Sequence, residues 1–324
     1  MLAMKLMLDQ GIEVHSVNFT SPLHQRGKKK SRAEGIAKVF DVPLASMELG
    51  SEYLRIVRHP KHGYGSGINP CIDCHALMLR KAKRYAREIG AKFIFTGEVL
   101  GERPMSQHQQ ALRIVEKEAG LQGKILRPLS ARLLPETEAE KKGWVDRSKL
   151  LSIRGRSRKP QIEQAKSLGL SDYPTPSGGC LLTEKEFAVR MKDLFAHRRR
   201  ISMTDILLLR VGRHFRFGEN RVVVGRDEDE NGTLLSLDNG HMTYLEAPNV
   251  NGPVTVLQGK PKKSAILTAA RLTARYCDGT DTLLVRYRRG NRTGSVTAER
   301  MPEAEVQAHR ITSNNSSKGC LPSE

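Results

Sequence analysis

Hydrophobic and polar positions alternate with two different periods along the first half of the chain. Short apolar runs predict strands, and segments with apolar residues at helical spacing predict helices between them. The predicted strands span 12–19, 43–49, 92–96 and 125–129, and the predicted helices span 1–11, 31–40, 70–90 and 106–120. This alternation is typical of an α/β fold with a Rossmann-like parallel sheet, which binds ligands beyond the carboxyl ends of its strands. We therefore expect a ligand at the loops that follow Phe19, Leu49 and Thr96.

The pattern changes in the second half and favours a smaller α+β domain. Residues 136–170 are helical and basic, and the proline- and glycine-rich segment YPTPSGGC ends at residue 180. The elements predicted beyond it are a helix at 184–200, a hairpin at 207–217 and 221–225, strands at 253–259, 283–289 and 294–299, and a helix at 263–277. We expect an α/β domain (1–175), a connecting helix (176–200), an α+β domain (201–307) and a disordered tail (308–324).

Charge adds a candidate partner to this picture. The 324 residues include 54 Lys and Arg against 35 Asp and Glu, a formal net charge of +19, which favours a phosphate-rich partner such as RNA. Basic runs occur at 24–32, 154–159, 197–200 and 260–263. The candidate RNA-binding residues are Arg156, Arg158, Lys159, Arg198, Arg199, Arg200, Lys260, Lys262 and Lys263. Because aromatic residues make up only 5%, recognition through shape and phosphates is favoured over base stacking.

Targeting signals and cysteine usage indicate a soluble cytoplasmic protein. No apolar run is long enough to span a bilayer, and the first residues lack the features of a signal peptide, so we expect no membrane contact. Five unevenly spaced cysteines argue against a disulfide framework. Thiol or metal chemistry therefore remains open. Cys277 is expected in the core and Cys320 without a role.

Cys71 and Cys74 share one face of a predicted helix start, with Asn69 as N-cap and Pro70 at the first helical position. A helix N-terminus lowers the pKa of a thiol, and a C-x-x-C pair can be a redox dithiol, half a zinc site or two ligands of an iron–sulfur cluster. Two small buried residues are the structural alternative. Cys180 adds a third thiol from a glycine-rich loop, and three thiolates can hold a cubane cluster with one open iron.

Zinc is the competing metal. The histidines at 59, 62 and 75 could complete a tetrahedral site with the cysteine pair. A second candidate site is FTGEVLGERPMSQ at 95–107, after the third predicted strand. There Gly97 would permit a tight exit, and Glu98 offers a carboxylate for a ribose, a metal or a base edge. An ordinary loop between strand and helix is the alternative for this segment.

The order of FTGEVLGERPMSQ, ILRPLS, GRSRKPQ and YPTPSGGCLLT resembles the adenine-nucleotide α-hydrolase (PP-loop) domain of tRNA 4-thiouridine synthases. The resemblance is to a short branch that lacks the rhodanese domain and has the C-x-x-C pair. Residues 210–235 and the helix AARLTARY resemble the small NFACT-like RNA-binding domain of that branch. Together these similarities cover about residues 1 to 300.

The resemblance implies ATP-dependent thiolation of tRNA, in which ATP with Mg²⁺ adenylates a uracil carbonyl oxygen and sulfur displaces AMP, giving 4-thiouridine. It implies that Cys71, Cys74 and Cys180 ligate a [4Fe-4S] cluster that holds hydrosulfide, or carry a persulfide. It also places Asn18, Gly97 and Glu98 near the nucleotide. Sulfide or a cysteine desulfurase would supply the sulfur.

One departure from the family concerns the phosphate loop. The family's S-G-G-x-D-S loop should stand between the first strand and the first helix, and this sequence begins inside that helix. We therefore expect weak ATP binding and no sulfur transfer from the chain as written, with the first strand and the loop supplied by upstream sequence. A non-catalytic iron–sulfur or zinc RNA-binding protein is the second hypothesis.

Overall fold

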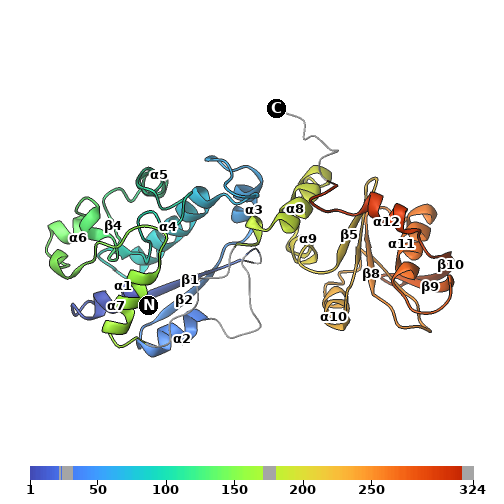
Figure 1. Cartoon of the computed structure of the whole chain (residues 1–324), viewed down its shortest axis with the longest axis horizontal. Helices are drawn as coiled ribbons and strands as arrows, with labels where there is room; N and C mark the ends of the chain where they lie inside the picture. Colours follow the sequence, from blue (N-terminus) through green and yellow to red (C-terminus); the bar gives the residue numbers. More distant parts are fainter. Residues whose placement is uncertain (22, 24–31, 171–179, 316–324) are drawn as a thin grey trace. The chain divides into compact units, whose positions relative to one another are not determined.

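The computed structural model describes residues 1–21, 23, 32–170 and 180–315 (Figure 1). The chain forms two compact units, Met1–Thr183 and Glu184–Glu324. The basic run at 24–32, except Arg32, lies outside the described residues, as do residues 173–179 of the glycine-rich motif and Cys320. Within the described parts, no helix combines the length and the apolar character needed to cross a membrane.

The first unit alternates helices with short parallel strands. Strand β1 (Ser16–Thr20) pairs with β2 (Leu44–Glu48), and β3 (Ile94–Phe95) pairs with β4 (Ile125–Leu126). The helices are α1 (Leu2–Leu8), α2 (Arg32–Val39), α3 (Ser51–Arg58), α4 (Cys71–Glu88), α5 (Gln109–Ala119), α6 (Glu138–Lys141) and α7 (Lys159–Ser167), with 3₁₀ turns at Ala131–Leu133, Arg147–Lys149 and Leu181–Thr183.

The predicted alternation and the parallel pairing are therefore confirmed for this unit, but the extent of the sheet was overestimated. The described strands form two separate two-stranded ladders, and a single Rossmann-like sheet is not present among them. The helical character expected over 136–170 is confirmed only in part, because this segment holds α6, a 3₁₀ turn and α7 with irregular backbone between them. Apolar side chains from α1, β4 and the following loops form one core, and α4 and α5 enclose another.

The second unit is built on one six-stranded antiparallel sheet (Figure 1). Its strand order is β10-β9-β7-β8-β6-β5. The strands are β5 (Arg213–Phe217), β6 (Asn220–Val224), β7 (Thr243–Glu246), β8 (Thr255–Gln258), β9 (Thr282–Arg289) and β10 (Arg292–Glu299). The helices are α8 (Lys185–His197), α9 (Met203–Leu208), α10 (Glu228–Ser236), α11 (Lys263–Arg275) and α12 (Glu303–His309). The closing pair of strands is confirmed, and the hairpin is confirmed for β5 and β6, but the first part of its predicted first arm, 207–208, belongs to α9.

Side chains alternate across this sheet and build a core on each face. Val222 and Val224 pack in the cluster that includes α11, whereas Val223 packs on the opposite face with Leu208 and Leu234. The expected disorder from residue 308 onward is wrong for the described part of that segment. Ile311 is buried there, and its N–H donates to the carbonyl of His214 at 2.8 Å.

Candidate functional site

Helix α4 presents Cys71 and Cys74 on its first turn, one residue later than predicted. Pro70 is the N-cap, and the Asn69 side chain does not cap the helix but donates from Nδ2 to Cys71 Sγ at 3.0 Å. The amide oxygen of Asn69 is buried and has no hydrogen-bond partner among the described residues. Such an orphaned atom beside a thiol is what a bound group or an ordered water satisfies.

The loop before α4 is tied to the helix by a buried carboxylate. Asp73 lies in the first turn of α4 and accepts hydrogen bonds from the backbone N–H groups of Lys61 and His62, at 3.3 and 3.0 Å. A negative charge is also favourable at a helix N-terminus. The tyrosine hydroxyl of the same loop, on Tyr64, donates to the carbonyl of Val57 in α3 at 2.8 Å. The two thiols therefore stand on a braced segment.

Cys180 lies near Cys71 and Cys74 because the segment that follows it packs against the loop before α4. The N–H of Ile68 donates to the carbonyl of Leu182 at 3.0 Å. Gly67 lies beside that contact with a φ of +72°, and a Cβ at its position would stand 2.3 Å from the Leu182 carbonyl oxygen. Glycine is thus required at residue 67 for both its conformation and the close approach of the two segments.

Tyr53 connects the thiols from a third element, α3. Its side chain is only 1% exposed, and its hydroxyl hydrogen-bonds to the thiols of both Cys74 and Cys180. The three sulfur atoms are close enough that negative charge on one raises the pKa of another. The structure therefore brings together the three cysteines that the sequence singled out.

The expectation that the helix N-terminus lowers the thiol pKa values is wrong. Burial raises the pKa of Cys74 to about 12, although the hydrogen bond with Tyr53 opposes the shift. Burial likewise raises the pKa of Cys71, against the charge of Arg103 and the hydrogen bond from Asn69, and it raises the pKa of Cys180. The thiols are thus held neutral until a cation or another electrophile compensates for their burial.

The histidines of the zinc alternative contact other groups. His62 Nε2 lies 3.2 Å from Glu118, and His75 Nδ1 lies 2.9 Å from Glu98, while His59 is exposed after the end of α3. Within the described residues, no group of three or more His, Cys, Asp or Glu side chains is arranged to hold a metal ion. An iron–sulfur cluster or a zinc ion at these thiols therefore stays a prediction.

Glu98 is the centre of a buried polar network. One carboxylate oxygen contacts His75, and the other accepts hydrogen bonds from Arg127 Nε and Thr96 Oγ1, each at 3.0 Å. Burial alone would raise the pKa of Glu98, but the hydrogen bonds and charges of His75 and Arg127 outweigh it and lower the pKa to about 2. The carboxylate stays ionised and fixes the end of β3 to β4 and α4.

Asn18 lies within a strand of the first unit, and Gly97 lies just beyond one. Asn18 is in the middle of β1, opposite Ser46 of β2, and Gly97 follows β3. The reason given for Gly97 is wrong, because its φ is not positive and a Cβ there would have no neighbour within 4 Å. Nucleotide contacts by Asn18, Gly97 and Glu98 stay predictions.

A cavity of about 190 Å³ lies between α5, the end of β4 and the segment after it. Arg127 lines it and is only 3% exposed, and one of its guanidinium nitrogens, Nη2, has no partner in the described part of the chain. Arg113, Glu116 and Glu140 also line the cavity, so its charges are mixed. The cavity was not expected from the sequence.

The predicted RNA-binding residues lie at helix ends. Arg156 precedes α7, Arg158 is its N-cap and Lys159 its first residue. Lys260 precedes α11, whose N-cap is Lys262 and whose first residue is Lys263. The three arginines at 198–200 follow α8 rather than end it, because the helix stops at His197, and Arg198 lies 3.4 Å from Asp205. Their contact with RNA stays a prediction.

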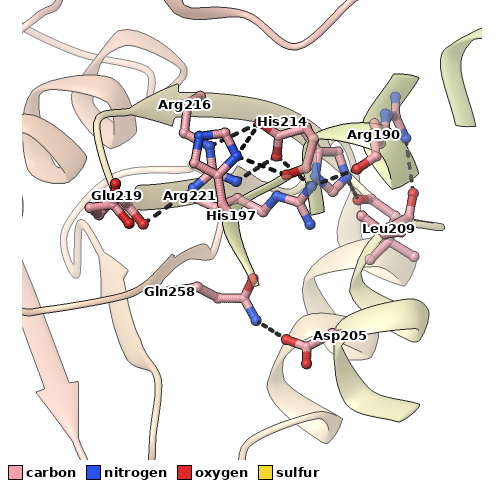
Figure 2. A network of polar contacts seen from close by, with 11 residues as sticks. Arg190, His197, Asp205, Leu209, His214, Arg216, Glu219, Arg221 and Gln258 are labelled. Carbon is pink, nitrogen blue, oxygen red and sulfur yellow. Dashed lines mark hydrogen bonds and ion pairs between the residues drawn. The ribbon is translucent and has the colours of Figure 1, made fainter. Parts of the chain in front are cut away.

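Figure 2 shows a further polar network of the second unit, where α8 meets β5 and β6. Asp193 accepts hydrogen bonds from Arg216 Nε at 2.9 Å and from Arg221 at 2.8 Å. Arg221 is only 2% exposed and also donates to the Arg190 carbonyl. Burial would raise the pKa of Asp193, but the two guanidinium groups outweigh it and lower this pKa. The network joins α8 to the sheet.

The chain thus combines an α/β unit that gathers three thiols with an antiparallel unit rich in arginine. Residues 2–132 match the family described as thiamine biosynthesis protein (ThiI), and residues 212–310 match the NFACT protein RNA binding domain. These two matches confirm the resemblance found in the sequence.

No curated protein matches the chain. Among solved structures, the chain is similar to the C-terminal part of the fibronectin/fibrinogen-binding protein from Streptococcus suis. The identity is 15%, the match covers 74% of this chain and 90% of that chain, and the TM-score is 0.28. This likeness carries no argument about function.

Changing Gly67 to alanine should detach the Cys180 segment. The positive φ and the clash with Leu182 together should lower the free energy of unfolding of the first unit by about 1–3 kcal/mol. Gly63→Ala is the matched control, because Gly63 has a φ of +71° and a Cβ there would meet nothing within 4 Å. Urea titrations followed by Trp144 fluorescence compare the two variants, and equal losses would contradict the proposed contact.

Proposed function

We propose that this protein acts in the ATP-dependent thiolation of a tRNA uridine, with sulfur handled by Cys71, Cys74 and Cys180. The observation that carries the proposal is the gathering of these three thiols, two of which, Cys74 and Cys180, share the Tyr53 hydroxyl, in a unit similar to ThiI. The similarity of residues 212–310 to an RNA-binding domain supports RNA as the substrate.

The reaction has two steps. The uracil carbonyl oxygen attacks the α-phosphorus of ATP, which releases pyrophosphate and leaves an O-adenylate on the base. Hydrosulfide then adds at the same ring carbon, and the bond from carbon to oxygen breaks to release AMP. Because a phosphate ester leaves far more easily than oxide, adenylation supplies the driving force for the exchange of oxygen by sulfur. The product is a thiouridine, with 4-thiouridine favoured by the resemblance.

The residues of the first unit perform separate tasks in this reaction. The three cysteines would hold a [4Fe-4S] cluster, which supplies an open iron for a sulfur ligand. Tyr53 places a hydroxyl between Cys74 and Cys180, where it can donate a hydrogen bond to sulfur and favour its anionic form. Gly67 allows the Cys180 segment to pack against the loop before α4, and Asp73 ties that loop to the first turn of α4.

Iron is favoured over zinc by the side chains around the thiols. The two histidines nearest in sequence, His62 and His75, contact Glu118 and Glu98 instead of the cysteines. A zinc site would therefore need at least one of these ion pairs to break, whereas three thiolates suffice for a cluster with an open iron.

The test is thiouridine formation with unmodified tRNA, ATP, Mg²⁺ and sulfide under anaerobic conditions, measured for the chain as written and for a chain extended upstream by a strand and the S-G-G-x-D-S loop of the family. From the extended chain we expect ATP-dependent AMP release with an equal amount of thiouridine, measured by mass spectrometry of digested tRNA, and loss of both in its Cys180→Ala variant, whereas the chain as written should form little thiouridine. A protein that binds tRNA and contains iron but forms no thiouridine would instead support the non-catalytic RNA-binding hypothesis.

A further inference from the structure

The loops of the second unit are gathered at the two ends of its sheet, and the strand register determines which loops share an end. All neighbouring strands are antiparallel. One end therefore holds the last residues of β5, β8 and β9 together with the first residues of β6, β7 and β10. The opposite end holds the first residues of β5, β8 and β9 and the last residues of the other three strands. Loops that are far apart in the sequence thus meet at each end.

The first of these ends carries loops that are rich in lysine and arginine. The loop between β8 and α11 contributes Lys260, Lys262 and Lys263, and the turn between β9 and β10 is bounded by Arg289 and Arg292. The three lysines and Arg292 are exposed, and within the described parts of the chain none of these five side chains makes a hydrogen bond or an ion pair. We call these five residues the basic end. The β9–β10 turn was not among the basic runs predicted from the sequence.

A buried contact brings a third basic segment, residues 198–200, to the basic end. Gln258 is the last residue of β8, and its Nε2 donates a hydrogen bond to Asp205 at 2.9 Å (Figure 2). Asp205 is only 3% exposed and also lies 3.4 Å from Arg198. The segment of three arginines is therefore held near the β8–α11 loop. Two basic runs that are distant in the sequence belong to one surface of the second unit.

Acidic side chains near the basic end do not cancel its charge. Asp238 is paired with Arg288, and Asp205 is engaged by Arg198. Glu219 in the β5–β6 turn is exposed. The first turn of α11 contains no acidic residue, although a helix N-terminus favours one. Positive charge thus remains in excess on the loops at this end.

Loops at the opposite end carry the opposite charge. The loop between α11 and β9 holds Asp278 and Asp281, and the loop after β6 leads into an acidic first turn of α10. The arginines found there are engaged within the unit, because Arg226 pairs with Glu230 and Arg300 donates to two backbone carbonyls. The sheet of the second unit is therefore polarised, with a basic end and an acidic end.

The chemistry of the basic end fits the phosphates of a nucleic-acid backbone. Lysine and arginine pair with phosphates, and the release of counterions from the nucleic acid supplies the affinity. Strands lie about 4.8 Å apart, so the six-stranded sheet is roughly 24 Å wide at this end and can span several successive phosphates. The β8–α11 loop and the β9–β10 turn contain no aromatic residue that could stack on a base. Contact through phosphates is therefore expected without selection of a base.

We propose that the basic end of the second unit binds the phosphate backbone of tRNA, with the β8–α11 loop and the β9–β10 turn on one stretch of RNA. This inference rests on the RNA-binding part of the proposed function and adds the surface that makes the contact. The similarity of residues 212–310 to an RNA-binding domain favours RNA over an anionic membrane as the partner. The acidic end faces away from the RNA.

The test measures binding of the full chain to tRNA as salt is raised. The double variant Lys262→Gln/Arg292→Gln takes one cation from each loop and should weaken binding on the order of tenfold and reduce the magnitude of the salt slope by about 2. The matched control Lys185→Gln/Arg286→Gln removes the same residue types from exposed positions elsewhere. Lys185 is the first residue of α8, and Arg286 lies opposite Glu246. The control should leave the slope nearly unchanged.

A further double variant, Asp278→Asn/Asp281→Asn, separates local contact from net charge. It removes two negative charges from the acidic end and so raises the net charge by as much as Lys262→Gln/Arg292→Gln lowers it. Strand β9 has eight residues and holds the two ends roughly 24 Å apart, about three Debye lengths at physiological salt. Binding to tRNA should therefore stay nearly unchanged, whereas binding that follows net charge alone would become tighter and would contradict the proposal.

Bound tRNA should also protect the lysines of the basic end from chemical acetylation. Mass spectrometry of the protein treated with and without tRNA should show reduced acetylation of Lys260, Lys262 and Lys263. Acetylation of Lys185 should not change. This measurement reports the contact directly in the unaltered chain, so it does not depend on how any variant folds.

The outcomes separate this proposal from the proposed function. Equal losses in Lys262→Gln/Arg292→Gln and its control, or equal protection of Lys185, would overturn the basic end and leave the proposed function standing. If the unaltered chain bound no tRNA, the proposed function would fail first. Tighter binding to vesicles of phosphatidylserine and phosphatidylcholine than to tRNA would overturn RNA as the partner. A Lys262→Arg/Arg292→Lys variant should keep the salt slope, and an unchanged thermal midpoint shows that the sheet still folds.

Discussion

Alanine at Cys180 should abolish iron binding by the anaerobically purified protein. Cys180 is the thiol that comes from outside α4, and without it only Cys71 and Cys74 remain. Loss of an outer-shell partner alone lowers the affinity for a metal by about 10–100-fold, and loss of a ligand should exceed that. We therefore expect at least about tenfold less iron per protein and the disappearance of visible absorbance, with the same result for Cys71→Ala and Cys74→Ala.

Cys277→Ala is the matched control for these three variants. Cys277 is also a buried free cysteine, but it lies after α11 in the second unit, where its thiol donates to the carbonyl of Thr273 at 3.3 Å. Its removal should leave the iron content and the absorbance unchanged. Stoichiometric zinc without iron in the unaltered protein, or an equal loss of iron from all four variants, would contradict a cluster on Cys71, Cys74 and Cys180.

The three cysteines were predictable from the sequence because their residue type and spacing limit their chemistry. What positions them was not predictable. Tyr53 is one aromatic residue in a short amphipathic helix, and only the fold shows that its hydroxyl meets two thiols. The pKa shifts also required the structure, because burial outweighs the helix N-terminus at Cys74 and no local pattern reports burial. The sequence signal that could have predicted α3 is the pair of apolar residues Tyr53 and Val57, which are four positions apart and so lie on one face of a helix.

In the second unit, the long periodic elements were predictable and several short ones were not. Helix α9 was taken as part of a strand because LLLR is apolar, although Ser202 and Asp205 form a capping box that marks a helix start. The start of α10 is marked in the same way, because the N-cap Asp227 accepts a hydrogen bond from the N–H of Glu230. Strand β7 has only four residues, and its place between β8 and β9 depends on long-range pairing.

The expected change with the largest effect on the second unit is Asp193→Asn. This variant leaves Arg216 and Arg221 near each other without the carboxylate that both contact, and Arg221 is only 2% exposed. Removal of one partner from a buried ion pair lowers the free energy of unfolding by about 3–5 kcal/mol. Glu303→Gln breaks the solvent-exposed pair with Arg275 and should change that free energy far less, because solvent screens the pair.

The two sides of the Asp193 network should respond unequally. Arg221→Met should be milder than Asp193→Asn, because Asp193 keeps its two hydrogen bonds to Arg216 and the methionine fills apolar space. The stability of the second unit should also depend on pH in the acid range.

The pKa of Asp193 is lowered in the folded state. The ionised carboxylate therefore stabilises the fold fully above the ordinary aspartate pKa of about 4, and this stabilisation is lost as the pH falls below that value. Hydrogen exchange of residues 213–224, measured with denaturant at several pH values, reports the stability of β5 and β6 separately from the first unit. Equal or reversed losses in the two variants, or an Asp193→Asn protein as acid-sensitive as the unaltered one, would show that Asp193 is not the centre of this network.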